Sequence, residues 1–191
     1  RLCCGDIIPA KVTHMESFGA FVDIGCGIIS LLSIDCISVS RISHPRDRLN
    51  VGMPIQVVVK IIDKATHRIF VSMRELLGTW EQNAAEFEVG QTVAGIVRSV
   101  EPYGIFIELA PNLAGLAELR NDGNTPPADH LIGQYTAVYI KSIIPERMKV
   151  KLVMVDAYHG DIRKMPLRYY INEETCQHMD YWRYSPEGSH K

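Results

Sequence analysis

The sequence predicts an all-β chain: two tandem five-stranded barrels, joined by a short helical linker and followed by a small β-rich C-terminal appendage. A motif that reads aromatic, glycine, apolar, Phe, β-branched, carboxylate occurs within Ser17–Asp23 and again, 85 positions later, within Pro102–Glu108. A matching glycine precedes each copy, Gly5 or Gly90, and short Val- and Ile-rich runs surround both. Solenoid repeats have periods of about 20–50 residues, so this longer period predicts two separately closed cores.

The first repeat is expected to occupy residues 1–75. Its expected strands are Ile7–Met15, Ala20–Ile24, Ile28–Ile34, Ile55–Ile62 and Arg68–Ser72. Gly25–Gly27 predicts a hairpin turn, and the polar segment Asp35–Asn50 predicts a loop or short helix. Five short strands in about 70 residues are typical of a small closed Greek-key barrel such as the OB-fold.

The second repeat, residues 89–156, follows the same plan after a linker at residues 76–88. Its expected strands are Thr92–Val100, Ile105–Leu109, Ala114–Leu119, Ala137–Ile144 and Lys149–Val155. In the linker, Thr79 and Gln82 form the pattern of a capping box that opens a short helix through Phe87. Trp80, Ala84 and Phe87 would share the face of that helix that packs on a barrel.

Composition excludes several classes of protein. The net charge of -2 argues against polybasic binding, and the five cysteines show no C-x-x-C spacing, which indicates reduced thiols of a cytoplasmic protein and no zinc site. No apolar run reaches the roughly 18 residues of a membrane span, and no signal peptide opens the chain. Because the first residue is Arg1, we expect that an upstream part is missing. No nucleophile elbow, phosphate-binding loop or paired metal-ligand histidines are present, so neither an enzyme nor a cofactor is expected.

The pattern of the first repeat resembles the S1 RNA-binding domain family. The matching segments are Gly5–Val12, Phe18–Gly25, Val51–Gly52, Val57–Asp63 and Arg68–Ser72. The second repeat resembles the family more loosely, through Val89–Val97, Tyr103–Phe106 and Gly115–Leu116. The resemblance implies an OB-fold barrel that holds single-stranded RNA on its outer face.

The resemblance also implies a set of contact residues. In the first repeat these are Phe18, Phe21, Asp63 and Arg68, while Ser33 stands at the position of a family histidine. In the second repeat they are Tyr103, Phe106 and Lys149, while Glu118 and Pro145 stand where the family has His and Asp. An acidic side chain near phosphates is unfavourable, so the second repeat is expected to bind RNA less well.

The residues themselves leave alternatives open. An exposed Phe offers a stacking platform for a base, but strict strand alternation would place Phe18 and Phe21 on opposite faces, one of them in the core, unless Gly19 introduces an irregularity. Among the histidines that could contact RNA (His14, His44 and His67), His67 is best placed because it precedes Arg68, although a plain surface role explains each one. A basic loop with Arg41, Arg46 and Arg48 could follow phosphates or be merely solvated.

Residues 157–191 interleave aromatic and basic side chains. This pattern can indicate a third RNA surface, but Leu167–Ile171 and Met179–Tyr184 are better explained as two strands of an appendage that packs on the second barrel. The same segment could bury a homodimer contact. We therefore expect a non-enzymatic protein that binds single-stranded RNA (mRNA or ribosomal) through the first barrel. The rival hypothesis is a protein-interaction module that docks on the ribosome or self-associates, with no membrane partner in either case.

Overall fold

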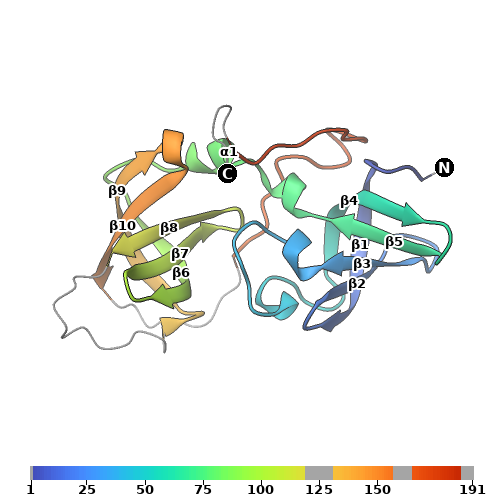
Figure 1. Ribbon diagram of the computed structural model, residues 1–191, viewed down its shortest axis with the longest axis horizontal. Coiled ribbons are helices and arrows are strands. Elements are labelled where there is room, and N and C mark those ends of the chain that lie inside the picture. The colour runs from blue at the N-terminus through green and yellow to red at the C-terminus, as the bar shows by residue number, and fades with distance from the viewer. Residues whose placement is uncertain (1, 119–130, 157–164, 186–191) are drawn as a thin grey trace. The chain divides into compact units, whose positions relative to one another are not determined.

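The computed structural model describes residues 2–118, 131–156 and 165–185, which contain two closed five-stranded β-barrels (Figure 1). The strands of the first barrel are β1 (Ile7–Glu16), β2 (Gly19–Asp23), β3 (Ile29–Ser33), β4 (Pro54–Asp63) and β5 (Arg68–Ser72). Their order around the barrel is β1-β2-β3-β5-β4, and β1 closes the ring by pairing with β4. All pairs are antiparallel except β3 and β5.

The second barrel repeats this topology. Its strands are β6 (Thr92–Glu101), β7 (Gly104–Ala110), β8 (Leu113–Glu118), β9 (Tyr135–Ile144) and β10 (Lys149–Asp156). Their order is β10-β8-β7-β6-β9, and the parallel pair is again the third strand with the fifth. Both predicted barrels are therefore confirmed, with each strand end within two residues of the expected one.

Inward-facing β-branched and Leu side chains form the core of each barrel. In the first barrel these include Val12, Val22, Leu32, Val59 and Val71, all at most 2% exposed. The corresponding inward residues of the second barrel are Val97, Ile107, Ala117, Ile140 and Leu152. Alternation along each strand then directs the intervening side chains outward, where they can bind a ligand.

The glycine of the repeated motif is required by close packing between neighbouring strands. A Cβ atom on Gly19 would lie 2.5 Å from the carbonyl oxygen of Leu32, and one on Gly104 would lie 2.8 Å from that of Ala117. Any other residue would push β3 or β8 away at the start of the pair. The glycine therefore lets the preceding aromatic residue sit directly beside the sheet.

The segments between the strands contain single helical turns. The expected loop between β3 and β4 contains η1 (Ile34–Cys36) and η2 (Pro45–Asp47), η3 (Arg74–Leu77) follows β5, and η5 (Pro145–Arg147) joins β9 to β10. The predicted capping box is confirmed, because Thr79 and Gln82 exchange side-chain to main-chain hydrogen bonds at the start of α1 (Trp80–Ala84). The helix ends before Phe87, and Trp80 and Ala84 are buried as its packing face against β8.

The tail departs from the prediction. The expected strands at Leu167–Ile171 and Met179–Tyr184 are not formed: within residues 165–185 the β-pairing is one antiparallel bridge between Asp6 and His178. The tail also packs on the first barrel, where the expectation was the second. Main-chain hydrogen bonds join Ile7 N to Gln177 O (2.9 Å), Met179 N to Gly5 O (2.7 Å) and Tyr170 N to Leu76 O (2.8 Å).

Apolar contacts hold the same segment. The Tyr169 ring packs against the core of the first barrel, and its hydroxyl accepts a hydrogen bond from Gln56 N (3.2 Å). Burial raises the pKa of Tyr169. Ile171 and Met179 cover a second small cluster around Ile7, Val58 and Leu76.

The first compact unit therefore consists of residues 1–78 and 166–184, while the second barrel lies in the unit made mainly of residues 79–165. The side chains of a regular strand would alternate between two faces, whereas this irregular segment directs Tyr169, Ile171 and Met179 toward one barrel.

Candidate nucleic-acid interface

Phe18 and Phe21 both lie on the surface of the first barrel. Phe18 is 53% exposed and belongs to the two-residue turn between β1 and β2, so strand alternation does not apply to it. Phe21 lies in β2 and is half-buried. The two rings meet edge to face, with centroids 6.0 Å apart and an interplanar angle of 89°. The alternative in which one of them is a core residue is therefore wrong.

Phe21 belongs to a row of outward side chains that crosses the barrel. Residues opposite one another on neighbouring strands present their side chains on the same face. Strand register pairs Phe21 with Leu31, Leu31 with Phe70 and Phe70 with Ile61. At the other end, a bulge in β1 places His14 opposite Phe21, and the two rings stack with centroids 6.0 Å apart. We call these five residues, His14, Phe21, Leu31, Phe70 and Ile61, the first row.

A groove of about 330 Å³ runs beside the first row. Its lining includes Phe18, Phe21 and Phe70, together with His67 and Arg68 from the turn and strand that follow β4. His67 and Arg68 are exposed, and His67 adopts a positive φ of 54° in this turn. The structure thus brings four of the predicted residues, Phe18, Phe21, His67 and Arg68, to one groove. Flat apolar rings beside a cation are an arrangement that proteins use to bind single-stranded nucleic acid.

The second barrel has the same aromatic pair but a different row. Tyr103 is 58% exposed, and its ring lies 6.2 Å from that of Phe106 at 88°. The row that contains Phe106 reads Ser99, Phe106, Leu116, Lys151 and Ser142. A lysine and two serines thus replace an aromatic residue, a histidine and an isoleucine. We call these five residues the second row.

A separate groove of about 410 Å³ lies between β8, β9 and β10 of the second barrel. Its lining includes Glu118, Lys141 and Lys151, but not Tyr103, Phe106 or Lys149. Lys149 is exposed at the start of β10, opposite Ile144. In the second barrel, the predicted residues are therefore not gathered in this groove.

Comparison with known proteins identifies the first barrel. The sequence model of the S1 RNA binding domain family matches residues 4–74. The first barrel is an S1 domain. These residues include all five strands of the barrel and both sides of the groove.

The similarity to known proteins extends past the S1 domain. The chain is 34% identical over 154 residues to small ribosomal subunit protein bS1 of Rhizobium meliloti (strain 1021), an alignment of 78% of this chain and 27% of that protein. It is 31% identical over 153 residues to bS1 of Staphylococcus aureus (strain COL), of which it covers 39%. The chain thus spans well under half the length of these relatives. The solution structure of GSP13 from Bacillus subtilis is 27% identical, with a TM-score of 0.37, over 39% of this chain and 57% of that one.

Two predicted residues of the S1 domain lie beside the groove and do not line it. Ser33 ends β3 opposite Gly19, on the same face of the strand as Leu31. Asp63 ends β4, and its carboxylate accepts hydrogen bonds from Ala65 N (3.0 Å) and Thr66 N (3.3 Å). Hydrogen bonds from Thr66, and then from Ala65, hold the pKa of Asp63 below its ordinary value. Asp63 therefore shapes the turn that presents His67 and Arg68.

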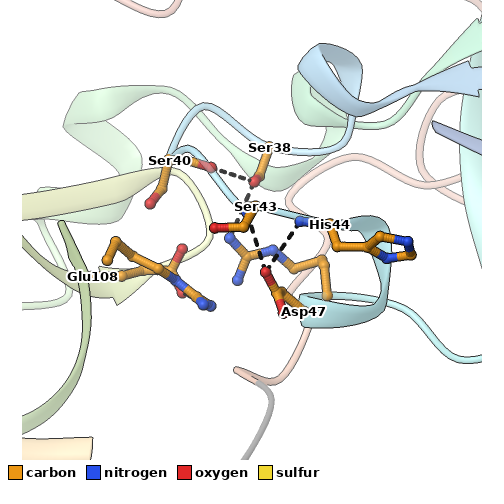
Figure 2. Close-up of polar contacts among 8 residues, drawn as sticks. Ser38, Ser40, Ser43, His44, Asp47 and Glu108 are labelled. Carbon is orange, nitrogen blue, oxygen red and sulfur yellow. Dashed lines mark hydrogen bonds and ion pairs between the residues drawn. The ribbon is translucent and has the colours of Figure 1, made fainter. Parts of the chain in front are cut away.

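The basic loop of the S1 domain is not wholly solvated, because Arg48 is buried while Arg41 and Arg46 are exposed. Arg48 is fully buried and donates to Ser38 Oγ (3.1 Å), which in turn donates to Ser40 O (2.8 Å) (Figure 2). Asp47 accepts from the main-chain N of Ser43 (3.1 Å) and His44 (3.2 Å). These contacts fix the loop, and His44 caps η2.

Sequence reasoning missed one aromatic member of the first row and did not place another. Phe70 is two positions from Arg68 on the same strand, so alternation alone would have placed both on one face. His14 was considered as an RNA contact but ranked below His67, and only the bulge between Val12 and His14 puts it opposite Phe21. A bulge of this kind has no clear sequence signature.

Within residues 2–118, 131–156 and 165–185, no three His, Cys, Asp or Glu side chains come together in a way that could hold a metal ion. Within the same ranges, no helix is long and apolar enough to cross a membrane.

Proposed function

We propose that this chain binds single-stranded RNA through the S1 domain, with bases stacked on the first row and the backbone held by Arg68. The observation that carries the proposal is the groove in which Phe18, Phe21, Phe70 and Arg68 meet. Each ring offers an apolar face to a base, and every base has such a face, so the site would tolerate many sequences. Arg68 would supply the attraction to phosphate, with His67 beside it.

The expected affinity is modest. Stacking contributes about 1–3 kcal/mol per base, so three platforms contribute about 3–9 kcal/mol. Association costs about 4–15 kcal/mol in lost freedom, and a few phosphate contacts offset part of that cost. The S1 domain should therefore bind a short strand weakly, with a Kd between about millimolar and about micromolar.

The relatives suggest the biological context. Both are ribosomal subunit proteins by name, and we propose that this chain meets mRNA or ribosomal RNA in the cytoplasm, without a cofactor and without catalysing a reaction. The role of Tyr103, Phe106 and Lys149 in this proposal is secondary, because Lys151 interrupts the stacking row of the second barrel.

A second candidate function is protein docking through the second barrel or the tail. Tyr139 and Val153 lie opposite one another on β9 and β10 and are 39% and 46% exposed. Exposed apolar pairs of this kind occur at protein interfaces. In this alternative, RNA contact would be incidental, and the chain would dock on the ribosome or on a second copy of itself.

The deciding experiment is a fluorescence-anisotropy titration with an unstructured oligouridine of about twelve nucleotides, within the about 4–16 nucleotides that OB-folds cover. The Phe18→Ala/Phe21→Ala variant should bind at least about tenfold more weakly than wild type, because at least one stack is lost. The matched control is Tyr103→Ala/Phe106→Ala, which removes the same pair from the second barrel. Equal affinity of wild type and a folded Phe18→Ala/Phe21→Ala variant would support docking instead.

A further inference from the structure

The tail and the first barrel enclose a second groove, of about 270 Å³. We call it the tail groove. Its lining includes Val58 and Lys60 from β4, Cys4 from the N-terminal segment, and Asp180, Tyr181 and Trp182 from the tail. All of these belong to the first compact unit. The tail groove therefore exists because the tail packs on the first barrel.

Lys60 connects the tail groove to the first row. The register of β4 against β5 shifts between Val59 and Ile61, so Lys60 is the bulged residue of the strand. Its neighbour Ile61 is the last residue of the first row and is 55% exposed. A bulge redirects the side chain that it carries, and Lys60 is exposed at the lip of the tail groove. An RNA strand that follows the first row across β2, β3, β5 and β4 would thus reach the ammonium group of Lys60.

The tail side of the groove offers an aromatic surface. Tyr181 is 76% exposed, the highest value among the large apolar and aromatic side chains that are exposed in the described residues. Trp182 also lines the groove, and its indole Nε1 is buried without a hydrogen-bond acceptor in the part of the chain that the structure describes. The Trp182 ring already contacts the Tyr184 ring, with centroids 6.0 Å apart, so the exposed Tyr181 ring is the one that offers a free face to a nucleobase.

The acidic side chain in the lining is partly offset. Asp180 lies 2.7 Å from His178 Nε2, and His178 Nδ1 lies 2.9 Å from Asp6. Hydrogen bonds to Asp6 and then to Asp180 raise the pKa of His178. Asp180 is thus engaged with His178, and Lys60 is an exposed lysine of the same lining.

We propose that the tail groove holds the next part of the same RNA strand, with a phosphate on Lys60 and a base on Tyr181. The inference rests on the proposed function of the first row and extends it by one subsite. It predicts that the binding site of this chain is longer than the S1 domain alone provides, and that the extra length is supplied by the tail.

The test compares two oligouridines, one of about four and one of about twelve nucleotides, both within the range of about 4–16 nucleotides that OB-folds cover. The Lys60→Ala/Tyr181→Ala variant should lose at least about tenfold in affinity for the long strand and keep wild-type affinity for the short one. Lys11→Ala is the matched control, since Lys11 is an exposed lysine of β1 that lines neither groove. A Phe21→Ala/Phe70→Ala variant should lose affinity for both strands.

The outcomes separate the two proposals. The tail groove alone would be overturned by two results together. The Lys60→Ala/Tyr181→Ala variant would keep its affinity for the long strand, and the Phe21→Ala/Phe70→Ala variant would lose affinity for both strands. Absence of binding by the wild type to either strand would overturn the proposed function and the tail groove with it. A second measurement uses wild-type protein and a long strand that carries one 4-thiouridine at each position in turn. Crosslinks to Tyr181 or Trp182 support the tail groove, and crosslinks confined to the first row overturn it.

Discussion

The two barrels share their strand order, an edge-to-face aromatic pair and two equivalent bulges, yet they present different surfaces. The inward residues that close each barrel are interchangeable apolar side chains, such as Val22 and Ile107. The outward row changes from Phe70 in the first barrel to Lys151 in the second. Burial constrains the inward face of a strand and leaves its outward face free to vary, so a duplicated fold does not imply a duplicated binding site.

Support from elsewhere in the chain also distinguishes the two barrels. The first barrel is covered by residues 166–184, which include Tyr169, Ile171 and Met179. The second barrel is packed by α1, which directly precedes it. The first barrel therefore depends on a distant segment, and the second depends on a local one.

The largest effect should come from weakening that distant support. The Tyr169→Ala substitution removes a ring from the core of the first barrel and the acceptor of the Gln56 hydrogen bond, so the free energy of unfolding of that barrel should fall by about 2–4 kcal/mol. Thermal or chemical denaturation, followed with one probe on each barrel, would measure it. Tyr181→Ala is the control from the same tail, and an unchanged transition of the first barrel in Tyr169→Ala would show that the tail is not part of its fold.

A smaller effect should distinguish the two rows. Phe70→Ala removes a stacking platform, so RNA affinity should fall about tenfold with no change in salt dependence. Lys151→Ala should change affinity little and lower the slope of log K against log salt by about 0.7, the share of one phosphate on a single strand. Titrations at two salt concentrations would separate these outcomes. If both variants changed the salt slope equally, the proposed difference between the rows would not hold.

The smallest effect should be a pH dependence of the contact between His178 in the tail and the carboxylates of Asp6 and Asp180. We call it the tail contact, and it has no counterpart among the described residues of the second barrel. Asp6 and Asp180 raise the pKa of His178 above its ordinary value of 6.5. The stabilisation of the folded state by this contact is therefore complete below pH 6.5 and is lost as the pH rises through the raised pKa. The pKa of Asp6 is lowered from 3.8, chiefly by His178, so its contribution is lost only as the pH falls below that value. The contact is therefore strongest between these two limits.

Hydrogen exchange can measure this effect. The Met179 amide donates a hydrogen bond to Gly5 O. As the pH rises above the raised pKa of His178, the exchange rate of this amide should increase by more than the intrinsic, pH-driven increase of an unprotected amide. The His178→Gln variant should lose that additional acceleration. A His178→Gln protein with the wild-type pH profile would assign the effect to another group.

The sequence predicted the barrels well because their signals are local. Glycines at fixed spacing, β-branched runs and a capping box at Thr79 each act within a few residues. Phe18, Phe21 and Arg68 were expected on one surface because of the resemblance to the S1 family, and His67 because it precedes Arg68, whereas strand alternation left the faces of Phe18 and Phe21 open. The tail was misjudged because the partners of Tyr169 and Met179 lie more than a hundred residues away, and nothing near them in the sequence indicates which barrel they cover. Arg48 was misjudged because a buried cation and an exposed one look alike without the fold.

The division of the first unit between residues 1–78 and 166–184 has a consequence for synthesis. When Gly78 has been added, all five strands of the first barrel exist, but its covering segment does not. The ribosome must add the whole second barrel before Pro166, which takes about 4–18 s at about 5–20 residues per second. During that interval the apolar patch around Ile7, Val58 and Leu76 lacks its final cover. A chain that terminates early would keep this patch exposed, which is a feature that chaperones and proteases recognise.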